Sequence, residues 1–211
     1  RKAGFDLSQA MEQAARPGFT PFSMDLTASA SFSNDFRHME CHNVLGMIEG
    51  SRYPDETVVY MAHWDHLGMT QGENGTEIYN GAVDNATGVA SLFAIAEAFR
   101  AEGKAPERSV LFIAVTAEES GLLGSKYYAE NPSFPLAKTI GGINIDALNV
   151  YGASRNVVSV GYGLSELDDY LKKHASAQDR VVQPNPYPER GYYFRSDHFN
   201  MARLGVPMIY A

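Results

Sequence analysis

The chain has 211 residues, of which 45% are hydrophobic and 20% charged, with a formal net charge of −8 and no block of Lys or Arg. This length and composition suit one globular domain with a substantial core, and they make nucleic acid or an anionic membrane surface a poor partner. No apolar run approaches the roughly 18 residues of a membrane-spanning helix, and the single cysteine, Cys41, excludes an internal disulfide and a thiolate metal cluster.

The first part of the chain predicts a short helix followed by strands. Residues 6–15 have an amphipathic helical pattern that Arg16-Pro17-Gly18 ends, and small and β-tending residues at 24–36 indicate an edge strand. Residues 42–49 predict another strand. The strongly apolar run at 57–63 predicts a central one.

A polar loop and the clearest helix of the chain follow. Residues 68–81 are polar and glycine-rich, which is typical of a surface loop. Residues 84–103 carry apolar side chains at helical spacing, and Gly103 is placed to end that helix. The apolar positions of this helix are Val89, Leu92, Phe93, Ala96 and Phe99.

Strands and helices continue to alternate to the end of the chain. The remaining predicted elements are strands at 110–116, 140–146, 156–160 and 206–210, a helix at 164–177 and a Pro/Tyr/Arg-rich loop at 184–197. This alternation favours an α/β fold with a mostly parallel, mixed central sheet and helices on both faces. No linker or repeat divides the sequence, so residues 1–211 are predicted to form a single domain, with the weakest pattern at 1–40.

Acidic and histidine side chains follow the ends of these predicted strands. They come from five separate segments and are His63, Asp65, His66, Asp84, Glu118, Glu119, Asp146, Asp197 and His198. Because the carboxyl ends of parallel strands meet at one edge of a sheet, we expect these side chains to gather there. The mixture suits zinc or a similar divalent metal and exceeds the three protein ligands of one catalytic zinc. A two-metal site with a bridging carboxylate would use them all.

Glu118 and Glu119 are adjacent acids directly after a buried strand. Neighbouring side chains on an extended segment point in different directions. One carboxylate can therefore bind a metal while the other faces a substrate. A solvated surface pair is the alternative, and the apolar strand before the pair and the glycine turn after it disfavour that alternative.

Six motifs in chain order resemble a known family. They are Asn43-Val-Leu-Gly46, Ala62-His-Trp-Asp-His66, Gly81-Ala-Val-Asp-Asn-Ala-Thr-Gly88, Ala117-Glu-Glu-Ser-Gly-Leu-Leu-Gly-Ser125, Asn144-Ile-Asp146 and Ser196-Asp-His198. From about residue 42 to its end, the chain is similar to the M28 family of zinc metallopeptidases, the aminopeptidase/carboxypeptidase group. The resemblance implies the three-layer sandwich of the zinc exopeptidases and a peptide as substrate.

The resemblance also implies a cofactor of two zinc ions and the residues that hold them. His63 and Asp146 are expected to bind one ion. Glu119 and His198 are expected to bind the second. Asp84 is expected to bridge the two.

Further roles follow from the same resemblance. Glu118 is implied as the general base that takes a proton from the metal-bound water. Asp65, two residues from His63 and so on the same side of an extended strand, is expected to accept the other imidazole N–H and fix the tautomer. The peptide bond between Asp84 and Asn85 is expected to be cis.

The aromatic loop at 184–197 has two open interpretations. In the first, the hydroxyl of Tyr193, or of Tyr192, stabilises the oxyanion of the tetrahedral intermediate, and Arg195 contacts a substrate carboxylate or the peptide backbone. In the second, the loop is packed for stability. The sequence does not decide between them.

The other histidines and the cysteine are expected to have no direct role in catalysis. His66 is predicted to lie behind the ligands or on the surface rather than to bind metal. His38, His42 and His174 are predicted to be ordinary residues, and Cys41 a small bystander.

Three alternatives to a di-zinc aminopeptidase remain open at this point. A carboxypeptidase or dipeptidase of the same family is almost as compatible with these motifs. A glutaminyl cyclase-like acyltransferase shares the fold but uses a single zinc, and the full set of carboxylates argues against it. A non-catalytic binding module is disfavoured because every expected ligand and the base are present.

The ends of the chain and its location are also matters of expectation. The chain begins with Arg1 and stops at Ala211 after a predicted strand, where relatives normally continue, so a truncated catalytic core is expected. Relatives of this kind are exported to the periplasm or the extracellular space, although the sequence carries no signal-peptide pattern.

Overall fold

A computed structural model describes residues 6–23, 25, 27–36, 38–73 and 75–210. It divides into two compact units, Arg1–Met39 and Glu40–Ala211, which are described separately. Whether the whole chain acts as one domain stays a prediction.

The first unit contains one helix, α1 (Leu7–Ala14), among its described residues. The Asp6 carboxylate caps it by accepting hydrogen bonds from the backbone N–H groups of Ser8 (2.9 Å) and Gln9 (3.3 Å). The strand predicted at 24–36 is wrong for residues 25 and 27–36, whereas 24 and 26 lie outside the described residues. Within the described part of the chain, no strand pairs with this exposed segment, and a β-conformation needs a partner for its backbone hydrogen bonds.

The second unit is built on a five-stranded sheet in the order β1-β5-β2-β6-β9. The strands are β1 (Val44–Ile48), β2 (Tyr53–His63), β5 (Arg108–Val115), β6 (Thr139–Asn144) and β9 (Met208–Tyr210). β1 is antiparallel to β5, and the other three pairings are parallel. The predicted mostly parallel mixed sheet is confirmed.

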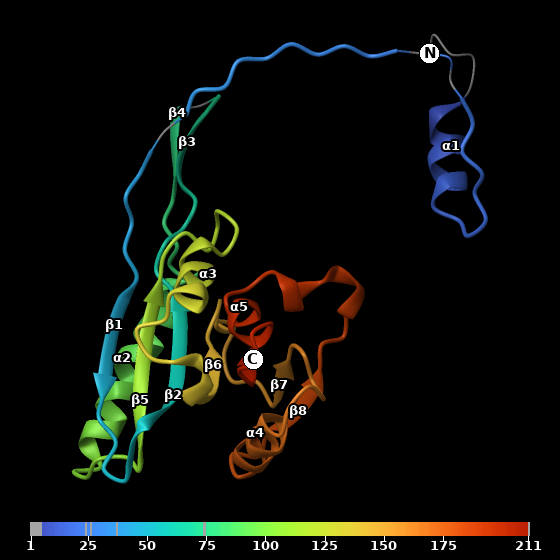
Figure 1. Cartoon of the computed structure of the whole chain (residues 1–211). Helices are drawn as coiled ribbons and strands as arrows, with labels where there is room; N and C mark the ends of the chain where they lie inside the picture. Colours follow the sequence, from blue (N-terminus) through green and yellow to red (C-terminus); the bar gives the residue numbers. More distant parts are fainter. Residues whose placement is uncertain (1–5, 24, 26, 37, 74, 211) are drawn as a thin grey trace. The chain divides into compact units, whose positions relative to one another are not determined.

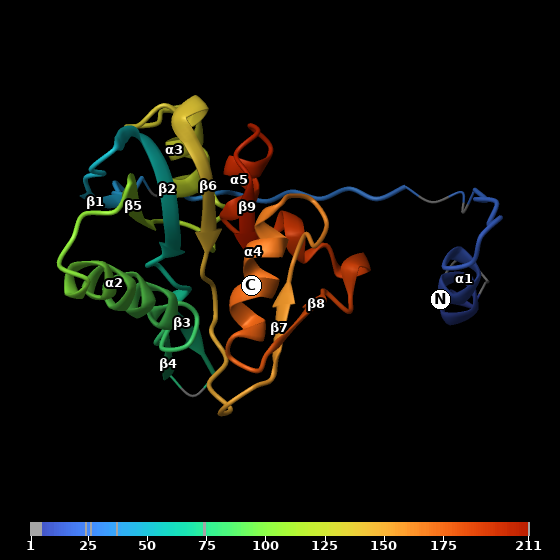
Figure 2. The same cartoon turned by 90° about the horizontal axis from the view of Figure 1, so that it is seen from below.

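Helices cover both faces of this sheet, as predicted (Figures 1 and 2). On one face, strand residues such as Val59 and Met61 pack against α3 (Leu123–Glu130) and α5 (His198–Ala202). On the other face, Ala62 and Phe112 pack against α2 (Ala86–Ala101). The alternation of side chains along β2 thus supplies two separate cores.

One apolar position of α2 was assigned to the wrong face. Leu92 is buried and Val89, Ala96 and Phe99 pack around it, but Phe93 is 69% exposed. Position 93 lies about 100° around the helix from Leu92, so spacing alone did not separate the two.

The polar stretch predicted as a loop at 68–81 forms a hairpin instead. β3 (Gly68–Gly72) pairs with β4 (Gly75–Tyr79) in antiparallel register. Nearly all described side chains of the hairpin are exposed. The sequence therefore has no buried face and no alternation of apolar residues to indicate a strand.

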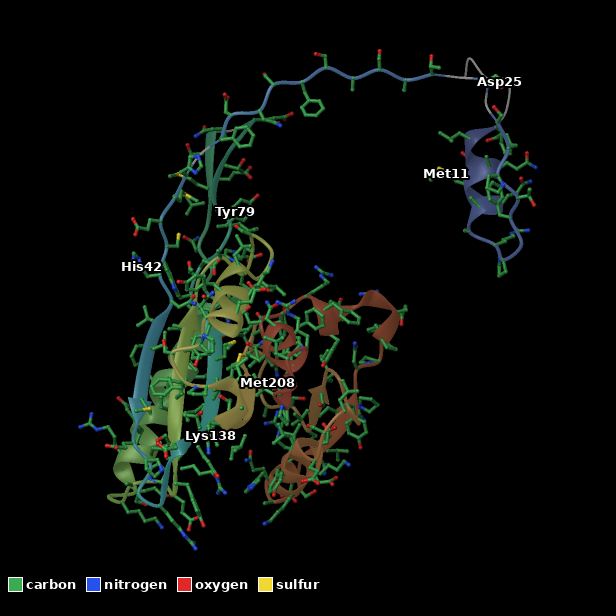
Figure 3. The ribbon with its side chains drawn as sticks, in the orientation of Figure 1. Met11, Asp25, His42, Tyr79, Lys138 and Met208 are labelled. Atoms are coloured by element: carbon green, nitrogen blue, oxygen red, sulfur yellow. The ribbon has the colours of Figure 1, made fainter. Side chains whose placement is uncertain are left out.

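A small two-stranded parallel sheet, β7 (Asn156–Ser159) and β8 (Val181–Pro184), accompanies α4 (Leu167–Ser176). β8 was not predicted. The loop after it contains two 3₁₀ turns, Pro188–Arg190 and Tyr192–Phe194. Figure 3 shows the side chains along these elements, with Met208 labelled on β9. Within the described part of the chain, no helix is both long and apolar enough to cross a membrane.

The parallel strands β2, β5, β6 and β9 end at the same edge of the sheet. His63 is the last residue of β2, and Glu118 follows β5 by three residues. Asp146 follows β6 by two, and Tyr210 ends β9. The register of the sheet therefore brings together side chains that are up to 147 residues apart, as Tyr210 and His63 show (210 − 63).

Candidate active site

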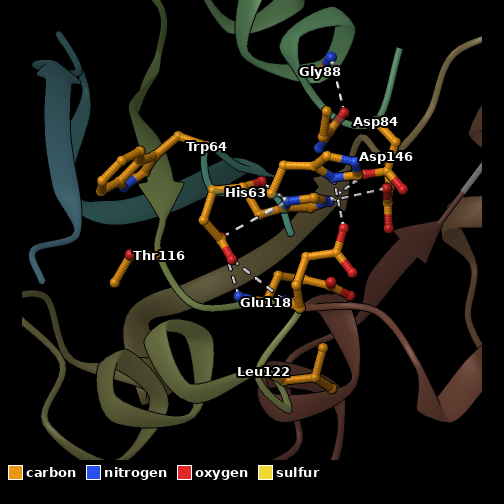
Figure 4. Close-up of polar contacts among 12 residues, drawn as sticks. His63, Trp64, Asp84, Gly88, Thr116, Glu118, Leu122 and Asp146 are labelled. Carbon is orange, nitrogen blue, oxygen red and sulfur yellow. Dashed lines mark hydrogen bonds and ion pairs between the residues drawn. The ribbon is translucent and has the colours of Figure 1, made fainter. Parts of the chain in front are cut away.

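Two carboxylate oxygens lie close to one ring nitrogen of His63 at this edge, and the His63 side chain is only 2% exposed. Its Nε2 lies 3.1 Å from Asp84 Oδ1 and 3.2 Å from Asp146 Oδ1 (Figure 4). Atoms that share one tetrahedral zinc at about 2.0–2.1 Å are separated by roughly 3.3 Å. Both distances from His63 Nε2 therefore match the spacing of a zinc site, and the three side chains are called here the buried ligand group.

Asp146, a member of the buried ligand group, is held in place by a chain of hydrogen bonds through Ser196 and Asn144. Ser196 Oγ donates to Asp146 Oδ2 at 2.7 Å, and Asn144 Nδ2 donates to Ser196 Oγ at 2.7 Å. Asn144 and Ser196 are both 1% exposed. These contacts leave the other oxygen of Asp146, Oδ1, directed at His63.

Asp65 occupies the predicted position but makes different contacts. The backbone oxygen of Asp65 lies 3.1 Å from His63 Nδ1, whereas its carboxylate is 3.8 Å from that nitrogen. The carboxylate instead accepts the backbone N–H groups of Glu118 (3.1 Å) and Glu119 (3.3 Å). Asp65 therefore ties the end of β2 to the two glutamates after β5.

The turn that carries these glutamates is fixed from its other side by Asn43. Asn43 Oδ1 accepts the N–H of Thr116 at 3.0 Å, and Nδ2 donates to the carbonyl of Gly124 at 2.9 Å. A Cβ on Gly124 would overlap the Thr116 carbonyl oxygen. The close return of the chain into α3 therefore requires glycine at this position.

Asp84 is positioned by the start of α2. The Asp84–Asn85 peptide bond is cis, as expected. The Asn85 side chain donates to the Ile145 carbonyl at 2.9 Å and accepts the N–H groups of Gly88 (3.0 Å) and Ala147 (3.2 Å). Asn85 thereby fastens the helix terminus, and Asp84 with it, to the end of β6.

A second set of ligand atoms converges beside the first and shares Asp84. It consists of His66, Asp84 and Glu119, called here the open ligand group. His66 Nδ1 lies 2.7 Å from Glu119 Oε1, and the two side chains are 22% and 21% exposed. The sequence had placed Glu119 and Asp84 at such a site but not His66.

His198 belongs to neither ligand group among the described residues, and its predicted role as a metal ligand stays a prediction. Its ring is fully buried between Tyr193 and Tyr210, with both ring centroids 4.9 Å away. Burial lowers the pKa of His198 to about 4. His198, the first residue of the short helix α5, thus lies in an aromatic cluster.

Tyr193 lies in the same aromatic cluster. Its ring packs edge-on against His198, Phe194 and Phe199, and a Cβ on Gly161 would meet it at 2.6 Å. Burial raises the pKa of Tyr193. These contacts support the packing interpretation of the loop. The oxyanion role of Tyr193 stays a prediction.

Burial and charge shift the pKa values of the central groups. Burial raises the pKa of Glu118 to about 8, and the carboxylates of Asp197 and Asp146 add to the effect. Burial lowers the pKa of His63, but the hydrogen bond and charge of Asp146 outweigh it and raise that pKa to about 9. So many acids around one imidazole favour a bound cation.

Two further residues belong to this site: Tyr210, which was not recognised from the sequence, and Asp197, which was expected at this edge but had no assigned role. Burial raises the pKa of the Tyr210 phenol, and the nearby Asp146 and Glu118 carboxylates raise it further. Asp197 is fully buried, and burial raises its pKa to about 7. The position of Tyr210 at the carboxyl end of the last strand was the signal that could have identified it. Arg195 is exposed and lies over the Tyr192 ring at 5.7 Å.

Comparison with known proteins decides the family. Residues 43–211 match the model of Peptidase family M28. The chain belongs to this family. The resemblance inferred from the six motifs is therefore confirmed.

One M28 relative is the Aminopeptidase NAALADL1 of Mus musculus, which is 33% identical over 138 residues. The matched region is 62% of this chain but 17% of that protein. The chain thus spans less than a fifth of this relative's length.

Solved structures confirm the α/β fold. BSAP, a zinc aminopeptidase from Bacillus subtilis, superimposes with a TM-score of 0.59 at 19% identity, over 80% of this chain and 39% of that chain. The Porphyromonas gingivalis glutaminyl cyclase superimposes with a TM-score of 0.60 at 22% identity, over 80% of this chain and 62% of that chain. At such identities the likeness concerns the fold alone.

Proposed function

We propose that this chain is a two-zinc metallo-exopeptidase that hydrolyses a terminal peptide bond, and that it acts as an aminopeptidase. The observation that carries the proposal is the pair of ligand groups that share Asp84, with Glu118 beside them and in neither. The fit of the buried ligand group to zinc spacing and the name of the NAALADL1 relative support it.

The residues present would divide the work as follows. His63 and Asp146 would hold one zinc, Glu119 would hold the second, and Asp84 would bridge them. Two zinc ions in these positions would acidify a water and polarise the scissile carbonyl. Asp65 would keep the metal ligands and the turn at Glu118 in register through its contacts with both.

Glu118 is proposed as the general base. Its carboxyl group is close enough to His63, Asp146 and Glu119 for their charges to act on it. A base must accept a proton from the attacking water without giving its charge to a metal, and Glu118 belongs to neither ligand group.

The aminopeptidase assignment has a test that separates it from its alternatives. The purified chain would be incubated with aminoacyl substrates, with N-blocked peptides that have a free C-terminus, and with N-terminal glutaminyl peptides. We expect release of the N-terminal residue. Release of the C-terminal residue would show a carboxypeptidase, and ring closure of glutamine without hydrolysis would show a cyclase.

Glu118→Gln tests the base. The amide keeps the shape of the side chain but cannot accept the proton, so kcat should fall by about 10²–10⁴-fold with the zinc content unchanged. Glu97→Gln on the exposed side of α2 is the matched control and should retain full activity. Turnover by Glu118→Gln at the wild-type rate would reject this assignment.

Export from the cell, which the resemblance implied, stays a prediction.

A further inference from the structure

We infer that a cavity between the β6–β7 connection and the turn from α4 to β8 binds the phosphate group of a small phosphomonoester, which Arg155 and Arg180 hold between them. None of the residues that line this cavity belongs to the buried or the open ligand group. The inference therefore does not rest on the proposed function. Three features carry it: the placement of the two arginines, their lack of acidic partners, and the room beside them.

The small parallel sheet brings Arg155 and Arg180 together (Figure 2). Its register pairs Asn156 with Val181, so the two arginines stand one position earlier on the two neighbouring segments. The Val181 N–H donates to the Arg155 carbonyl at 2.7 Å, which continues the pairing back to the arginines. Neighbouring strands lie roughly 4.8 Å apart, and residues in register share a face. Both arginine side chains accordingly line the cavity.

The two arginines lack an acidic partner of their own. Within the described part of the chain, neither forms an ion pair, in contrast to Arg52, Arg108 and Arg203, which each pair with a glutamate. The chain as a whole is acidic, with a net charge of −8. Two neighbouring positive charges repel each other, and an anion from outside the chain would relieve this repulsion.

The Arg180 guanidinium is held in place while part of it stays free. Its Nε donates to the Ser154 carbonyl at 3.1 Å. Ser154 is fixed in turn, because its Oγ accepts the Asn156 N–H at 3.1 Å, and Asn149 closes the loop before it by donating to the Gly152 carbonyl at 2.8 Å. A guanidinium fixed through Nε can present its terminal amino groups to an oxyanion with little further ordering.

The charge and size of the cavity favour a phosphomonoester. Such a group carries a charge of about −1.5 to −2 at pH 7 and three acceptor oxygens, so it can accept hydrogen bonds from two guanidinium groups at once. The cavity has a volume of about 820 Å³, within the roughly 300–1,000 Å³ of small-molecule pockets. It therefore has room for an organic group as well as the phosphate, with Leu148 and Ala153 as an apolar wall.

One acid, Asp179, also lines the cavity. Asp179 is exposed, and its backbone lies in the left-handed region with φ 55°. Its negative charge opposes an anionic ligand, which gives the inference a test with a defined sign. Because asparagine tolerates this backbone conformation, Asp179→Asn removes the repulsion without strain and should tighten binding.

The experiment measures binding to the full chain by calorimetry at constant ionic strength. The probes are glycerol phosphate as a phosphomonoester, inorganic phosphate, and citrate as an anion with carboxylates only. Arg155→Gln removes one guanidinium whose side chain makes no hydrogen bond or ion pair within the described residues, so little structure is lost. Arg100→Gln, at an exposed position of α2, is the matched control with the same change of charge.

We expect the wild type and Arg100→Gln to bind one glycerol phosphate per chain. Arg155→Gln should bind it about 10–100-fold more weakly, the usual effect of removing a hydrogen bond between charged groups. Asp179→Asn should bind it about 2–10-fold more tightly, as removal of a like charge predicts. Inorganic phosphate should compete for the same site with lower affinity, because it lacks the organic group.

Several outcomes would overturn the inference. Equal affinities of Arg155→Gln and Arg100→Gln would show that the phosphate binds elsewhere, a metal ion included, and no binding to the wild type would show that the site does not exist. Citrate or inorganic phosphate bound as tightly as glycerol phosphate would reject the assignment to a phosphomonoester. Peptide hydrolysis is measured separately, so each of these failures is distinguishable from a failure of the proposed function.

A measurement on the wild type covers the case in which Arg155→Gln does not fold. In protein labelled with ¹⁵N-arginine, glycerol phosphate should shift the Nε signals of Arg155 and Arg180 and saturate at one ligand per chain, while the Arg100 signal stays in place. Signals of Arg155 and Arg180 that do not move would overturn the inference.

Discussion

The two ligand groups share Asp84 but differ in how firmly the protein holds them. In the buried ligand group, the side chains of His63 and Asp146 are 2% and 11% exposed. The backbone oxygen of Asp65 accepts a hydrogen bond from His63, and Ser196 donates one to Asp146, which fixes both side chains. In the open ligand group, His66 and Glu119 are 22% and 21% exposed, and Nδ1 of His66 has no hydrogen-bond partner.

The difference teaches that strand ends and loops make unlike ligand groups. His63 and Asp146 follow central parallel strands whose register is fixed by the core. His66 lies beyond the strand, and its direction depends on a solvent-exposed hairpin. Preorganised ligands bind metal more tightly because less order must be imposed on binding. We therefore expect a tight first ion in the buried ligand group and a weaker second ion in the open one.

The largest expected effect comes from truncating the buried ligand group. His63→Ala removes the imidazole shared by both short contacts of that group. Zinc binding in the buried ligand group and detectable hydrolysis should both be lost, whereas Glu119→Ala should retain one zinc ion. Metal analysis and peptide turnover on the two variants check this. Equal zinc loss from both variants would remove the distinction between the groups.

A smaller effect is expected from removing a residue that hydrogen-bonds a ligand without being a ligand itself. Ser196→Ala deletes the 2.7 Å hydrogen bond to Asp146. Zinc affinity of the first site should fall by about 10–100-fold, the usual effect of losing a partner behind a ligand. Competition with a chelator measures the affinity, and Ser91→Ala on α2 is a control away from the ligands. First-site affinity within a factor of two of wild type would show that this contact is unimportant.

Stepwise chelation should separate the two groups without mutation. Because the open ligand group is more exposed, its ion should leave at a chelator concentration at least about tenfold lower than the first. Zinc per chain at each concentration should show a plateau near one. Simultaneous loss of both ions would contradict the comparison.

The smallest expected effect concerns the metal-free protein and pH. Burial raises the pKa of Glu118 from 4.5 to about 8, so between these values the unfolded chain releases a proton that the folded chain keeps. The stability contributed by protonated Glu118 is complete below about pH 4.5 and is lost as the pH rises through about 8. Glu118→Gln cannot ionise, so its Tm should increasingly exceed that of the wild type over this range. A Tm difference independent of pH would show that Glu118 is not so perturbed.

The sheet and the edge where the candidate ligands gather were predictable because buried strands leave a strong pattern. The apolar runs before His63 and Glu118 predicted β2 and β5, and the acids at their ends predicted the edge where the site lies. The helix pattern starting near Asp84 placed that carboxylate as well. These features depend on burial, and the spacing of apolar residues along the sequence indicates which segments are buried.

The position of His66 beside Glu119 and the burial of His198 could not be predicted in the same way. The orientation of His66 depends on a hairpin whose exposed residues have no apolar alternation. The ring of His198 is directed by a five-residue helix and by packing against Tyr193 and Tyr210. Both depend on tertiary contacts between distant segments, which a local pattern does not contain.

The most direct test of the central claim is a zinc titration of the metal-free full chain with simultaneous measurement of N-terminal residue release. The account predicts no release without zinc, binding of about two zinc ions, and release that depends on them and on Glu118. Peptide hydrolysis that proceeds without metal, or two bound zinc ions without any hydrolysis, would contradict it.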